Sequence, residues 1–575
     1  MGRKVSPGSA DLKPTRALAL AAALALVPGV ARGQEVDARA AQAEFERFRV
    51  ARLPWSHEPR GGPCDEVVGR FCYRHEGDAR RRPPPAEPAE VPDARDTLLA
   101  RLDAAAARAP GDGWILGQRV RYRIEAGRPL EAAAVAASCG ADGWWCAALE
   151  GAGRHAAGEF AAAERAFDRA LASMPAAIRE RWADLGPVLD GSAVGAWGRL
   201  GPGGREAFAR RAWWAADPLW SVPGNERRTE HLSRHVWDRL QEGAASAYDV
   251  AWGDDLSELL VRYGWPVGWE RIRRDVGRLG GGSRPGIVAH DPPGARRFVP
   301  TLAAIADPAV AGAGEWPLDD PAPRSTYAPA YASRFVSLEP QIATFRRGAE
   351  AIVVAGWALP VDSLATVAPA EAALLVSAGP DVPFRVARAS GPAAGGALQV
   401  RARWARAVVG VEVVGEGIGG RWRSGLELPA ARPDPPAVSD LLLLDLDGPL
   451  PASLDEALPL TRPTATVIPG ERLGVFWEAY PEPGEPADPV TMSLALHAAE
   501  AGPGARLARA LRLADAPPGA RLRWHESLPP LTVAPRAVAL QLPDLPPGRY
   551  VLELELRWPR GRTAVARREV SVVRP

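Results

Sequence analysis

Apolar residues repeat at helical spacing through much of the first half of the chain. The pattern predicts helices in four stretches: 38–52, 96–107, an Ala-rich region up to about 190, and 205–245. Asn225 lies within the last stretch as a candidate N-cap, because its side-chain oxygen can accept a backbone N–H of the following turn. Residues 264–331 are rich in Gly and Pro and show no clear period. We therefore expect part of this segment to wrap over neighbouring helices.

From about residue 341 the period changes to that of strands. Short apolar runs alternate with Gly- and Pro-rich turns, and Leu alternates strictly with Glu from Leu552 to Leu556. This pattern predicts two β-sandwiches that meet near the ARPDPP segment 431–436. The predicted strand cores are 351–355, 372–376, 407–414, 441–444, 473–477, 491–496, 538–542 and 550–556. The expected fold class is multidomain α+β, with an N-terminal helical repeat-like part followed by two β-sandwich-like domains.

Two segments between residues 96 and 190 resemble one another. Their turn glycines, Gly127 and Gly158, are 31 residues apart, close to the 34-residue period of tetratricopeptide repeats. The second segment carries the small, large and helix-ending residues of that motif at Gly151, Gly158, Ala163, Phe167, Ala170 and Pro175. We predict a short tetratricopeptide-like stack, and an ordinary Ala-rich helical hairpin is the alternative.

The first 33 residues have the order of a secretory signal peptide. Basic residues precede an apolar run from Ala17 to Val27, and Ala31-Arg32-Gly33 offers a cleavage site before Gln34. The run is too short to span a bilayer, which needs about 20 apolar residues. No Cys closely follows it, so a lipoprotein is not expected. We predict a periplasmic or extracellular protein with no transmembrane span in the mature chain.

The four cysteines are Cys64, Cys72, Cys139 and Cys146. An even number in an exported chain predicts disulfides, and pairing neighbours gives Cys64–Cys72 and Cys139–Cys146. The spacing differs from the C-x2-C pairs of zinc and thioredoxin-like sites. Free buried thiols are the alternative.

Composition excludes several function classes. The 575 residues contain 70 Lys+Arg and 69 Asp+Glu, so the chain lacks the basic surplus typical of nucleic-acid binding. Its two lysines, Lys4 and Lys13, both lie in the leader. The mature chain therefore cannot use a Schiff-base, pyridoxal-phosphate, Walker A or Ser-Lys mechanism. The 20 tryptophans either fill volume beside small Ala side chains or form exposed binding surfaces.

Residues 205–275 carry a family resemblance. The stretches WWAADP (213–218), NERRTEH (225–231) and AWGDD (251–255), with Arg262, Tyr263 and Gly264 after them, resemble the GWxTD-domain family. The resemblance implies an exported bacterial protein with no settled biochemical activity. Trp252 and Asp255 match the eponymous motif, whereas Ala251 and Asp254 replace its Gly and Thr. From the residues themselves, Trp252 is a candidate core anchor and Asp255 a candidate cap for the following helix.

One pair of histidines has metal-ligand spacing. His231 and His235 are four residues apart on a predicted helix, and Asp238 falls on the same side. The glutamate of an H-E-x-x-H motif is missing, and packed histidines are the favoured alternative. His290-Asp291 lies in a Pro/Gly loop without an evident nucleophile, and Gly280 to Ser283 forms no phosphate-binding motif. We predict no metal, cofactor or catalytic residue.

The sequence therefore favours a non-enzymatic binding or scaffold protein whose partners are proteins or envelope polysaccharides, with the oligomeric state open. The alternative is a metal-assisted or carboxylate-based hydrolase of envelope polymers that uses some of Glu226, Glu230, His231, His235, Asp238 and Asp255. The predicted organisation is a signal peptide (1–33), an N-terminal helix, disulfide loop and Pro-rich linker (34–95), tetratricopeptide-like helices (96–190), a GWxTD-like helical domain with a long loop (191–335), and two β-sandwiches (340–435 and 437–575).

Overall fold

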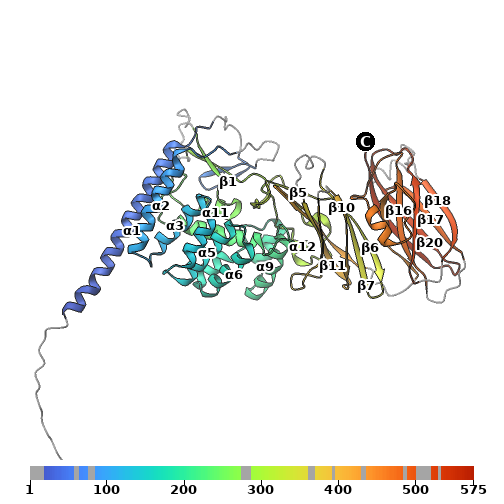
Figure 1. Ribbon diagram of the computed structural model, residues 1–575, viewed down its shortest axis with the longest axis horizontal. Helices are drawn as coiled ribbons and strands as arrows, with labels where there is room; N and C mark the ends of the chain where they lie inside the picture. Colours follow the sequence, from blue (N-terminus) through green and yellow to red (C-terminus); the bar gives the residue numbers. More distant parts are fainter. Residues whose placement is uncertain are drawn as a thin grey trace, which may run out of the picture. The chain divides into compact units, whose positions relative to one another are not determined.

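The computed structural model confirms the α+β fold class (Figure 1). It describes residues 18–56, 64–75, 84–272, 286–360, 370–391, 395–428, 436–482, 489–499, 520–528 and 532–574. The chain forms two compact units. Unit 1 comprises residues 1–74, 82–184 and 229–291, and unit 2 comprises residues 75–81, 185–228 and 292–575.

Unit 1 is mainly helical. Its helices are α1 (Leu18–Arg52), α2 (Glu90–Arg108), α3 (Gly113–Glu125), α4 (Pro129–Ala137), α5 (Gly143–Ala156), α6 (Phe160–Ser173), α7 (Ala176–Trp182), most of α10 (Glu226–Leu240) and α11 (Asp254–Tyr263). Two antiparallel hairpins complete it, β1 (Glu66–Val68) with β2 (Phe71–Tyr73) and β3 (Gly268–Arg271) with β4 (Ile287–His290). The long loop predicted from residue 264 thus contains strands, and in unit 2 it also contains short helices.

Helices α3 to α6 form two consecutive helical hairpins. Each hairpin turns at a glycine in the left-handed region, Gly127 with φ 72° and Gly158 with φ 76°. Gly151 faces the ring of Phe167, where an added Cβ would lie 2.9 Å from ring carbons. Small residues therefore let these helices approach, as the repeat pattern requires. The tetratricopeptide assignment itself remains a prediction.

Unit 2 begins with a helical layer on the first β-sandwich. The layer contains α8 (Gly191–Gly198), α9 (Pro202–Ala216), α12 (Leu302–Ala306) and the 3-10 turn η1 (Ala313–Glu315). Ala215, Trp220 and Trp316 pack there against Leu375 and Val408 of the sheet. The first sandwich consists of sheets ordered β5-β12-β11-β8-β9 and β10-β7-β6. Its strands are β5 (Arg334–Ser337), β6 (Gln341–Arg347), β7 (Glu350–Ala358), β8 (Ala370–Ser377), β9 (Arg385–Gly391), β10 (Gly395–Ala402), β11 (Arg406–Gly415) and β12 (Ile418–Glu427).

The second sandwich also has two sheets. In one, β16 pairs with β13 and β14 along one edge and with β19 along the other; the second sheet has the order β15-β21-β20-β17-β18. The strands are β13 (Ala437–Val438), β14 (Leu442–Asp445), β15 (Thr466–Val467), β16 (Arg472–Tyr480), β17 (Pro489–Ala498), β18 (Ala520–Ser527), β19 (Ala534–Gln541), β20 (Gly548–Arg557) and β21 (Thr563–Val572). The turns α13 (Leu454–Ala457) and η4 (Leu458–Leu460) lie between β14 and β15.

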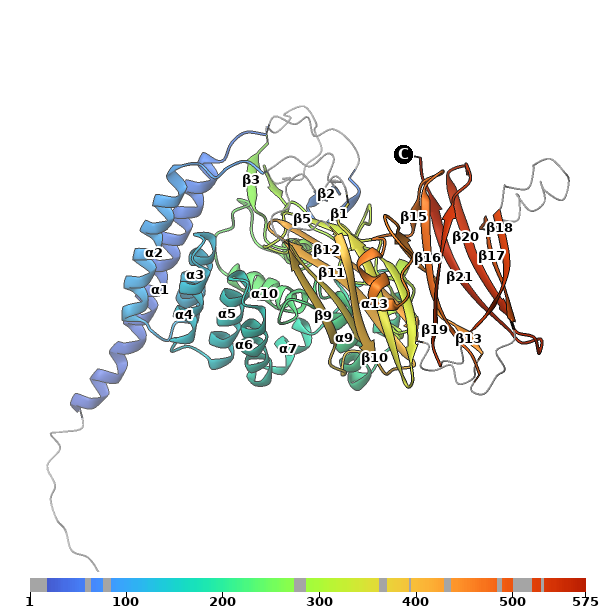
Figure 2. The ribbon, with the colours of Figure 1, turned by 45° about the vertical axis from the view of Figure 1, so that its right-hand side comes forward.

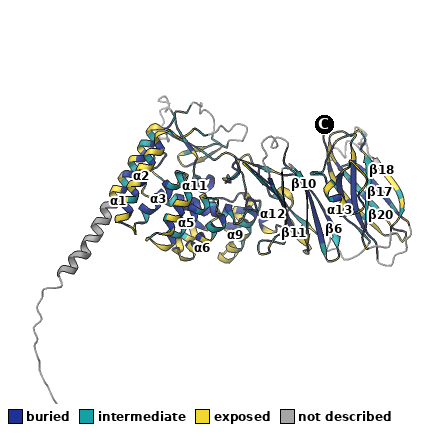
Figure 3. Ribbon diagram, in the orientation of Figure 1, coloured by how far each residue is buried: buried dark blue, intermediate teal, exposed yellow. Residues whose placement is uncertain are grey.

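The sheet β10-β7-β6 belongs to both sandwich cores. Val353 of β7 points into the core of the first sandwich, whereas Val354 packs with Phe345, Leu444 and Phe476 in a core shared with the second. Figure 1 shows β6 and β7 between β11 and β16, and Figure 2 shows β10 of the same sheet between β11 and β16. Alternate side chains of one strand therefore fill two cores, as in strands buried on both faces. Figure 3 shows this burial in dark blue.

Polar groups complete the junction between the sandwiches. The Gln341 amide donates to the carbonyls of Leu443 and Arg462 and accepts from the Leu443 N–H at 2.7 Å. Arg568 of β21 donates to the carbonyls of Leu441 and Ile342. Each contact satisfies a buried backbone group, so hydrogen bonds as well as apolar packing join the two sandwiches.

Both predicted disulfides are present. Cys64 is bonded to Cys72 with a Cα–Cα distance of 5.3 Å, and Cys139 to Cys146 with 5.9 Å. The first closes the β1–β2 hairpin, and the second joins the end of α4 to the first turn of α5.

Several predicted features lie wholly or partly outside the described residues. These are the first 17 residues of the leader, the glycine turn 280–283, part of the Pro-rich linker and most of the 431–436 boundary. The rest of the leader continues as α1, whose side chains are described from Glu35 onward. Among the described residues, none of the helices combines the length and apolar character needed to cross a bilayer.

Replacing Gly356 with Ala tests the junction between the sandwiches. An added Cβ on Gly356 of β7 would lie 2.0 Å from the Arg462 carbonyl oxygen, which is a backbone atom with little room to move. We expect Gly356→Ala to lower the free energy of unfolding by about 1–3 kcal/mol, measured by urea denaturation.

The control is Gly396→Ala on the adjacent strand β10, where the nearest atom, on the Trp357 ring, is an ordinary 3.7 Å away. Equal losses in the two variants would contradict the tight backbone approach at Gly356.

Candidate functional site

Helix α10 carries five of the six ionisable residues named for a hydrolase, and four of these five lie in unit 1: Glu230, His231, His235 and Asp238. Glu230 accepts from the Arg234 Nε at 2.7 Å, and its other oxygen lies 2.7 Å from the His155 Nε2. Burial alone would raise the pKa of Glu230, but Arg234 and His155 outweigh it and hold that pKa well below its usual range. Glu230 is thus a fixed carboxylate held in an ion pair.

The two histidines on α10 are packed rather than open. The His231 Nε2 lies 3.1 Å from the Trp182 carbonyl oxygen. The His235 ring stacks on the Trp182 ring at a centroid distance of 5.6 Å. Burial lowers the pKa of His235 to about 3, and the nearby Arg181 adds to the effect, so this ring is neutral at physiological pH.

Asp238 is hydrogen-bonded to residues other than the two histidines. Its Oδ1 accepts from the Trp252 Nε1 at 2.8 Å and from the Ser257 hydroxyl at 2.5 Å. Within the described part of the chain, His, Cys, Asp and Glu side chains form no group of three that could hold a metal ion. The i, i+4 spacing of His231 and His235 reflects helix packing here.

The AWGDD segment (251–255) contacts the disulfide hairpin. Asp255 lies in the first turn of α11, because Gly253 rather than Asp255 precedes the helix. Its two oxygens accept from Arg70 of the hairpin, from Nε at 2.7 Å and from Nη2 at 2.8 Å. These hydrogen bonds lower the pKa of Asp255 to about 2. Asp255 therefore anchors the hairpin, and its Oδ1 also accepts from the Leu256 N–H in the first turn of α11 at 2.9 Å.

Arg262 and Tyr263 extend the same contact. Arg262 donates to both oxygens of Glu66 on β1, at 2.7 and 2.5 Å. The Tyr263 ring stacks on Tyr73 of β2 with a centroid distance of 3.9 Å. Gly264 has φ 91° where the chain turns past the Arg234 guanidinium. The motif residues thus hold the Cys64–Cys72 hairpin on α11.

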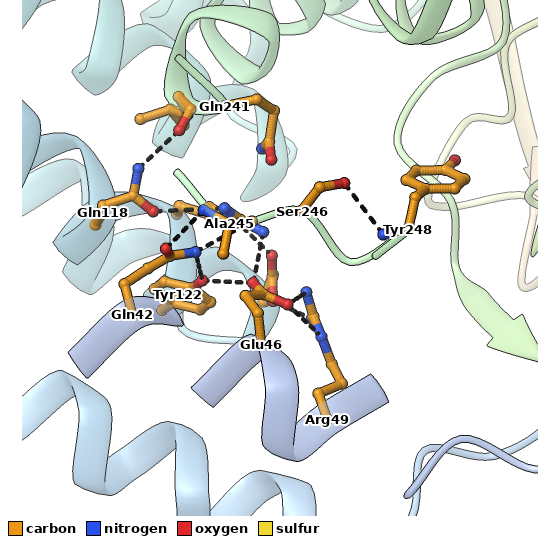
Figure 4. A network of polar contacts seen from close by, with 12 residues as sticks. Gln42, Glu46, Arg49, Gln118, Tyr122, Gln241, Ala245, Ser246 and Tyr248 are labelled. Atoms are coloured by element: carbon orange, nitrogen blue, oxygen red, sulfur yellow. Dashed lines mark hydrogen bonds and ion pairs between the residues drawn. The ribbon is translucent and has the colours of Figure 1, made fainter. Parts of the chain in front are cut away.

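A buried polar network in unit 1 was missed by the sequence analysis. Figure 4 shows Glu46 of α1 between Arg49 and Tyr122. Glu46 accepts from the Tyr122 hydroxyl at 2.6 Å and from Arg121 at 2.9 Å, and Arg49 reaches Glu125 at 2.9 Å. The side chains of Glu46 and Arg49 are each 2% exposed. Their three-residue spacing on one predicted helix was the available signal.

The network also fixes the segment after α10. Gln42 donates to the Tyr122 hydroxyl and to the Ala245 carbonyl, each at 2.9 Å, and accepts from the Ala245 N–H (Figure 4). Gln118 donates to the Leu240 carbonyl at 2.7 Å. Helices α1 and α3 and the chain after α10 are therefore joined by satisfied hydrogen bonds, which suits a rigid scaffold more than a reactive site.

In unit 2, Glu226 occupies a different environment. Its Oε2 accepts from the Tyr327 hydroxyl at 3.1 Å and its Oε1 from the Tyr331 hydroxyl. Burial raises the pKa of Glu226 to about 8 despite these hydrogen bonds, and the Glu412 carboxylate adds to the effect. The group is therefore mostly a neutral acid at pH 7.

Glu412 belongs to a second buried cluster in unit 2. It accepts from Arg423 at 2.9 Å and from the backbone N–H groups of Trp220 and Ser221. Arg421 donates to the carbonyls of Asp217 and Phe298. These side chains point from β11 and β12 toward the helical layer. Because β12 is rich in polar residues, its sequence did not predict a strand.

Comparisons with known proteins give no family. No family model matches the chain, and no curated protein matches it. Among solved structures, red sea bream transglutaminase is 12% identical over 41% of this chain and 31% of that chain, with a TM-score of 0.14. Salmonella alpha-2-macroglobulin reacted with methylamine is 13% identical over 44% and 17%, with a TM-score of 0.15. The FN1-FN3 domains of chicken CNTN1 are 10% identical over 41% and 67%, with a TM-score of 0.15.

This chain therefore spans about a third of the transglutaminase and about a sixth of the alpha-2-macroglobulin. Likenesses of this size do not identify what the chain binds.

Removing Glu46 tests the buried network. Glu46→Ala leaves Arg49 and Arg121 buried without this carboxylate, which should lower the free energy of unfolding by about 3–5 kcal/mol in urea denaturation. Glu44→Ala, two residues earlier on α1, removes an exposed pair with Arg101 and should leave the free energy of unfolding nearly unchanged. A small loss at Glu46 would show that the network is open to water.

Glu226→Gln tests the buried acid by pH. Because the folded-state pKa is about 8 and the usual value is 4.5, the folded protein binds an extra proton between these pH values. This bound proton stabilises the folded state at low pH, and the stabilisation is lost as pH rises through 8. Between pH 5 and 8.5 the wild type should lose on the order of 3 kcal/mol more unfolding free energy than Glu226→Gln.

Glu230→Gln, one turn further along α10, is the matched control. Since its carboxylate is stabilised by Arg234 and His155, this substitution should destabilise the protein already at pH 7. Parallel pH profiles for the wild type and Glu226→Gln would contradict the buried neutral acid.

Proposed function

We propose that this chain is an exported, non-enzymatic binding or scaffold protein. The observation that carries the proposal is the pairing of every ionisable residue considered for hydrolysis. Glu230 is paired with Arg234, and Asp238 accepts from Trp252. His231 and His235 both pack on Trp182. Glu226 accepts from two tyrosine hydroxyls, and Asp255 holds the disulfide hairpin. A hydrolase needs such groups gathered around one substrate position.

Two further features support this role. β-Sandwiches with helical layers are frequent frameworks for binding, since their loops and edges present surfaces on a rigid core. Two disulfides favour an oxidising compartment, which agrees with the predicted leader. We also propose that residues 205–275 form a divergent GWxTD-type segment whose motif residues serve to hold the hairpin.

Export is tested on the chain produced in its own cells with a C-terminal tag. We expect recovery outside the cytoplasm, an N-terminus at Gln34 by mass spectrometry, and no free thiols before reduction. A cytoplasmic protein that keeps Met1 and free thiols would contradict export.

Binding is tested by capture of partners from the exported fraction, followed by their identification. His235→Gln is the matched control, because it replaces one neutral, packed ring with another neutral group. We expect the wild type and this variant to retain the same discrete partners. Turnover of a cell-wall polymer that the wild type performs and His235→Gln abolishes would favour the hydrolase instead.

A further inference from the structure

An open pocket of about 440 Å³ lies between the two sandwiches of unit 2, beside the edge strand β10. Its volume falls within the range of about 300–1,000 Å³ that is usual for small-ligand sites, which are often found between domains. Ile352 of β7 forms part of the lining, beside Gln399 and Arg401 of β10. Asp455 of α13 and Glu478 of β16 line it from the second sandwich.

Strand geometry explains why polar side chains of β10 enter this pocket. Gln399 is paired with Val354, and Arg401 with Ile352. Both Val354 and Ile352 point into the core shared with the second sandwich. Cross-strand partners lie on the same face of a sheet, so Gln399 and Arg401 point the same way. They extend this face beyond the apolar core, where β10 is the edge strand.

Hydrogen-bonding capacity remains unused in the pocket. The Gln399 Oε1 is buried and has no partner among the described residues. Arg347 donates two N–H groups to Glu478 and one to the Arg346 carbonyl, and it also interacts with Tyr480, so its guanidinium is held in place. Arg401 is 67% exposed, and its ion pair among the described residues is with Glu350, at 3.9 Å.

The pocket is balanced in formal charge. Arg347 and Arg401 oppose Asp455 and Glu478, so neither an anion nor a cation is favoured by net charge. The groups open to a ligand on β10 are the Gln399 amide and the Arg401 guanidinium, with the Asp455 carboxylate opposite. A zwitterion would satisfy the charges of Arg401 and Asp455 and leave the Gln399 amide unmatched. Several adjacent hydroxyls, each able to donate and accept, match Gln399, Arg401 and Asp455.

We propose that this cleft binds an uncharged saccharide of one or two sugar units, either free or as part of a longer chain that leaves through the open side. The proposal rests on the binding role proposed above and names a ligand class for it. Gln399 and Arg401 contact the sugar hydroxyls from one wall, Asp455 accepts from the other, and the Arg347–Glu478 pair forms the polar floor.

The test is calorimetric titration of the full chain with three neutral disaccharides: cellobiose, chitobiose and maltose. Gln399→Leu removes the unmatched amide at similar size, and Arg401→Ala removes an exposed guanidinium, so both variants should fold. Arg403→Ala is the matched control, because Arg403 also pairs with Glu350 and is 75% exposed but does not line the cleft. Thermal melts of all variants provide the folding check.

We expect saturable binding of at least one disaccharide, weakened about tenfold by Gln399→Leu and by Arg401→Ala and unchanged by Arg403→Ala. Three results would overturn the proposal: no binding of any of the three sugars, binding that survives both cleft substitutions, or preferential binding of glycylglycine or inorganic phosphate, which probe for a zwitterion and an anion. Failure here while partner capture succeeds would refute only the saccharide cleft, and the binding role would stand.

Discussion

The burial of both faces of the sheet β10-β7-β6 is the constraint on which unit 2 depends. Its side chains complete the core of the first sandwich on one face and a core shared with the second sandwich on the other. Because successive residues of a strand point to opposite faces, a shift of one residue in β7 would exchange the contents of two cores at once. The two sandwiches are thereby fixed to each other, and the pocket at the edge of β10 acquires walls of defined spacing.

Unit 1 obtains its order from a different source. Ala-rich helices bury little apolar area per residue, and large side chains such as Trp182 and Phe167 fill the space between them. Buried ion pairs then join the helices, since Glu46 and Glu125 lie among three buried arginines. Such pairs contribute specificity of arrangement more than net stability, because each charge must first lose its water.

Periodicity allowed much of the fold to be predicted and little of its polar interior. The runs 351–355, 407–414 and 550–556 lie in strands β7, β11 and β20, because apolar side chains with β-spacing identify strands buried on at least one face. Strand β12 was not predicted because buried arginines occupy alternate positions in it. Their charge is matched by Glu412 in the neighbouring strand β11. Strand β9 was not predicted because it is largely exposed on both faces and so has no apolar period.

The contacts of the candidate residues could not be predicted from local sequence either. His231 and His235 have ligand spacing in sequence, yet what surrounds them comes from Trp182, about fifty positions earlier. Likewise, Glu46 and Arg121 are 75 residues apart along the chain. Local spacing reports which side chains share a helix face, but it does not report which distant element covers that face. The pairing of each charge therefore had to come from the tertiary structure.

The absence of lysine after residue 13 connects these observations. Every cationic side chain beyond the leader is an arginine or a histidine, and arginine presents five N–H groups in a plane. One guanidinium can therefore satisfy several buried acceptors, as Arg421 does with the carbonyls of Asp217 and Phe298 and Arg568 with those of Leu441 and Ile342. Ionisable groups with displaced pKa values often mark active sites. In this chain the pKa values of Glu230 and Asp255 are lowered because arginines hold the two carboxylates in structural pairs, so perturbed titration here reports architecture.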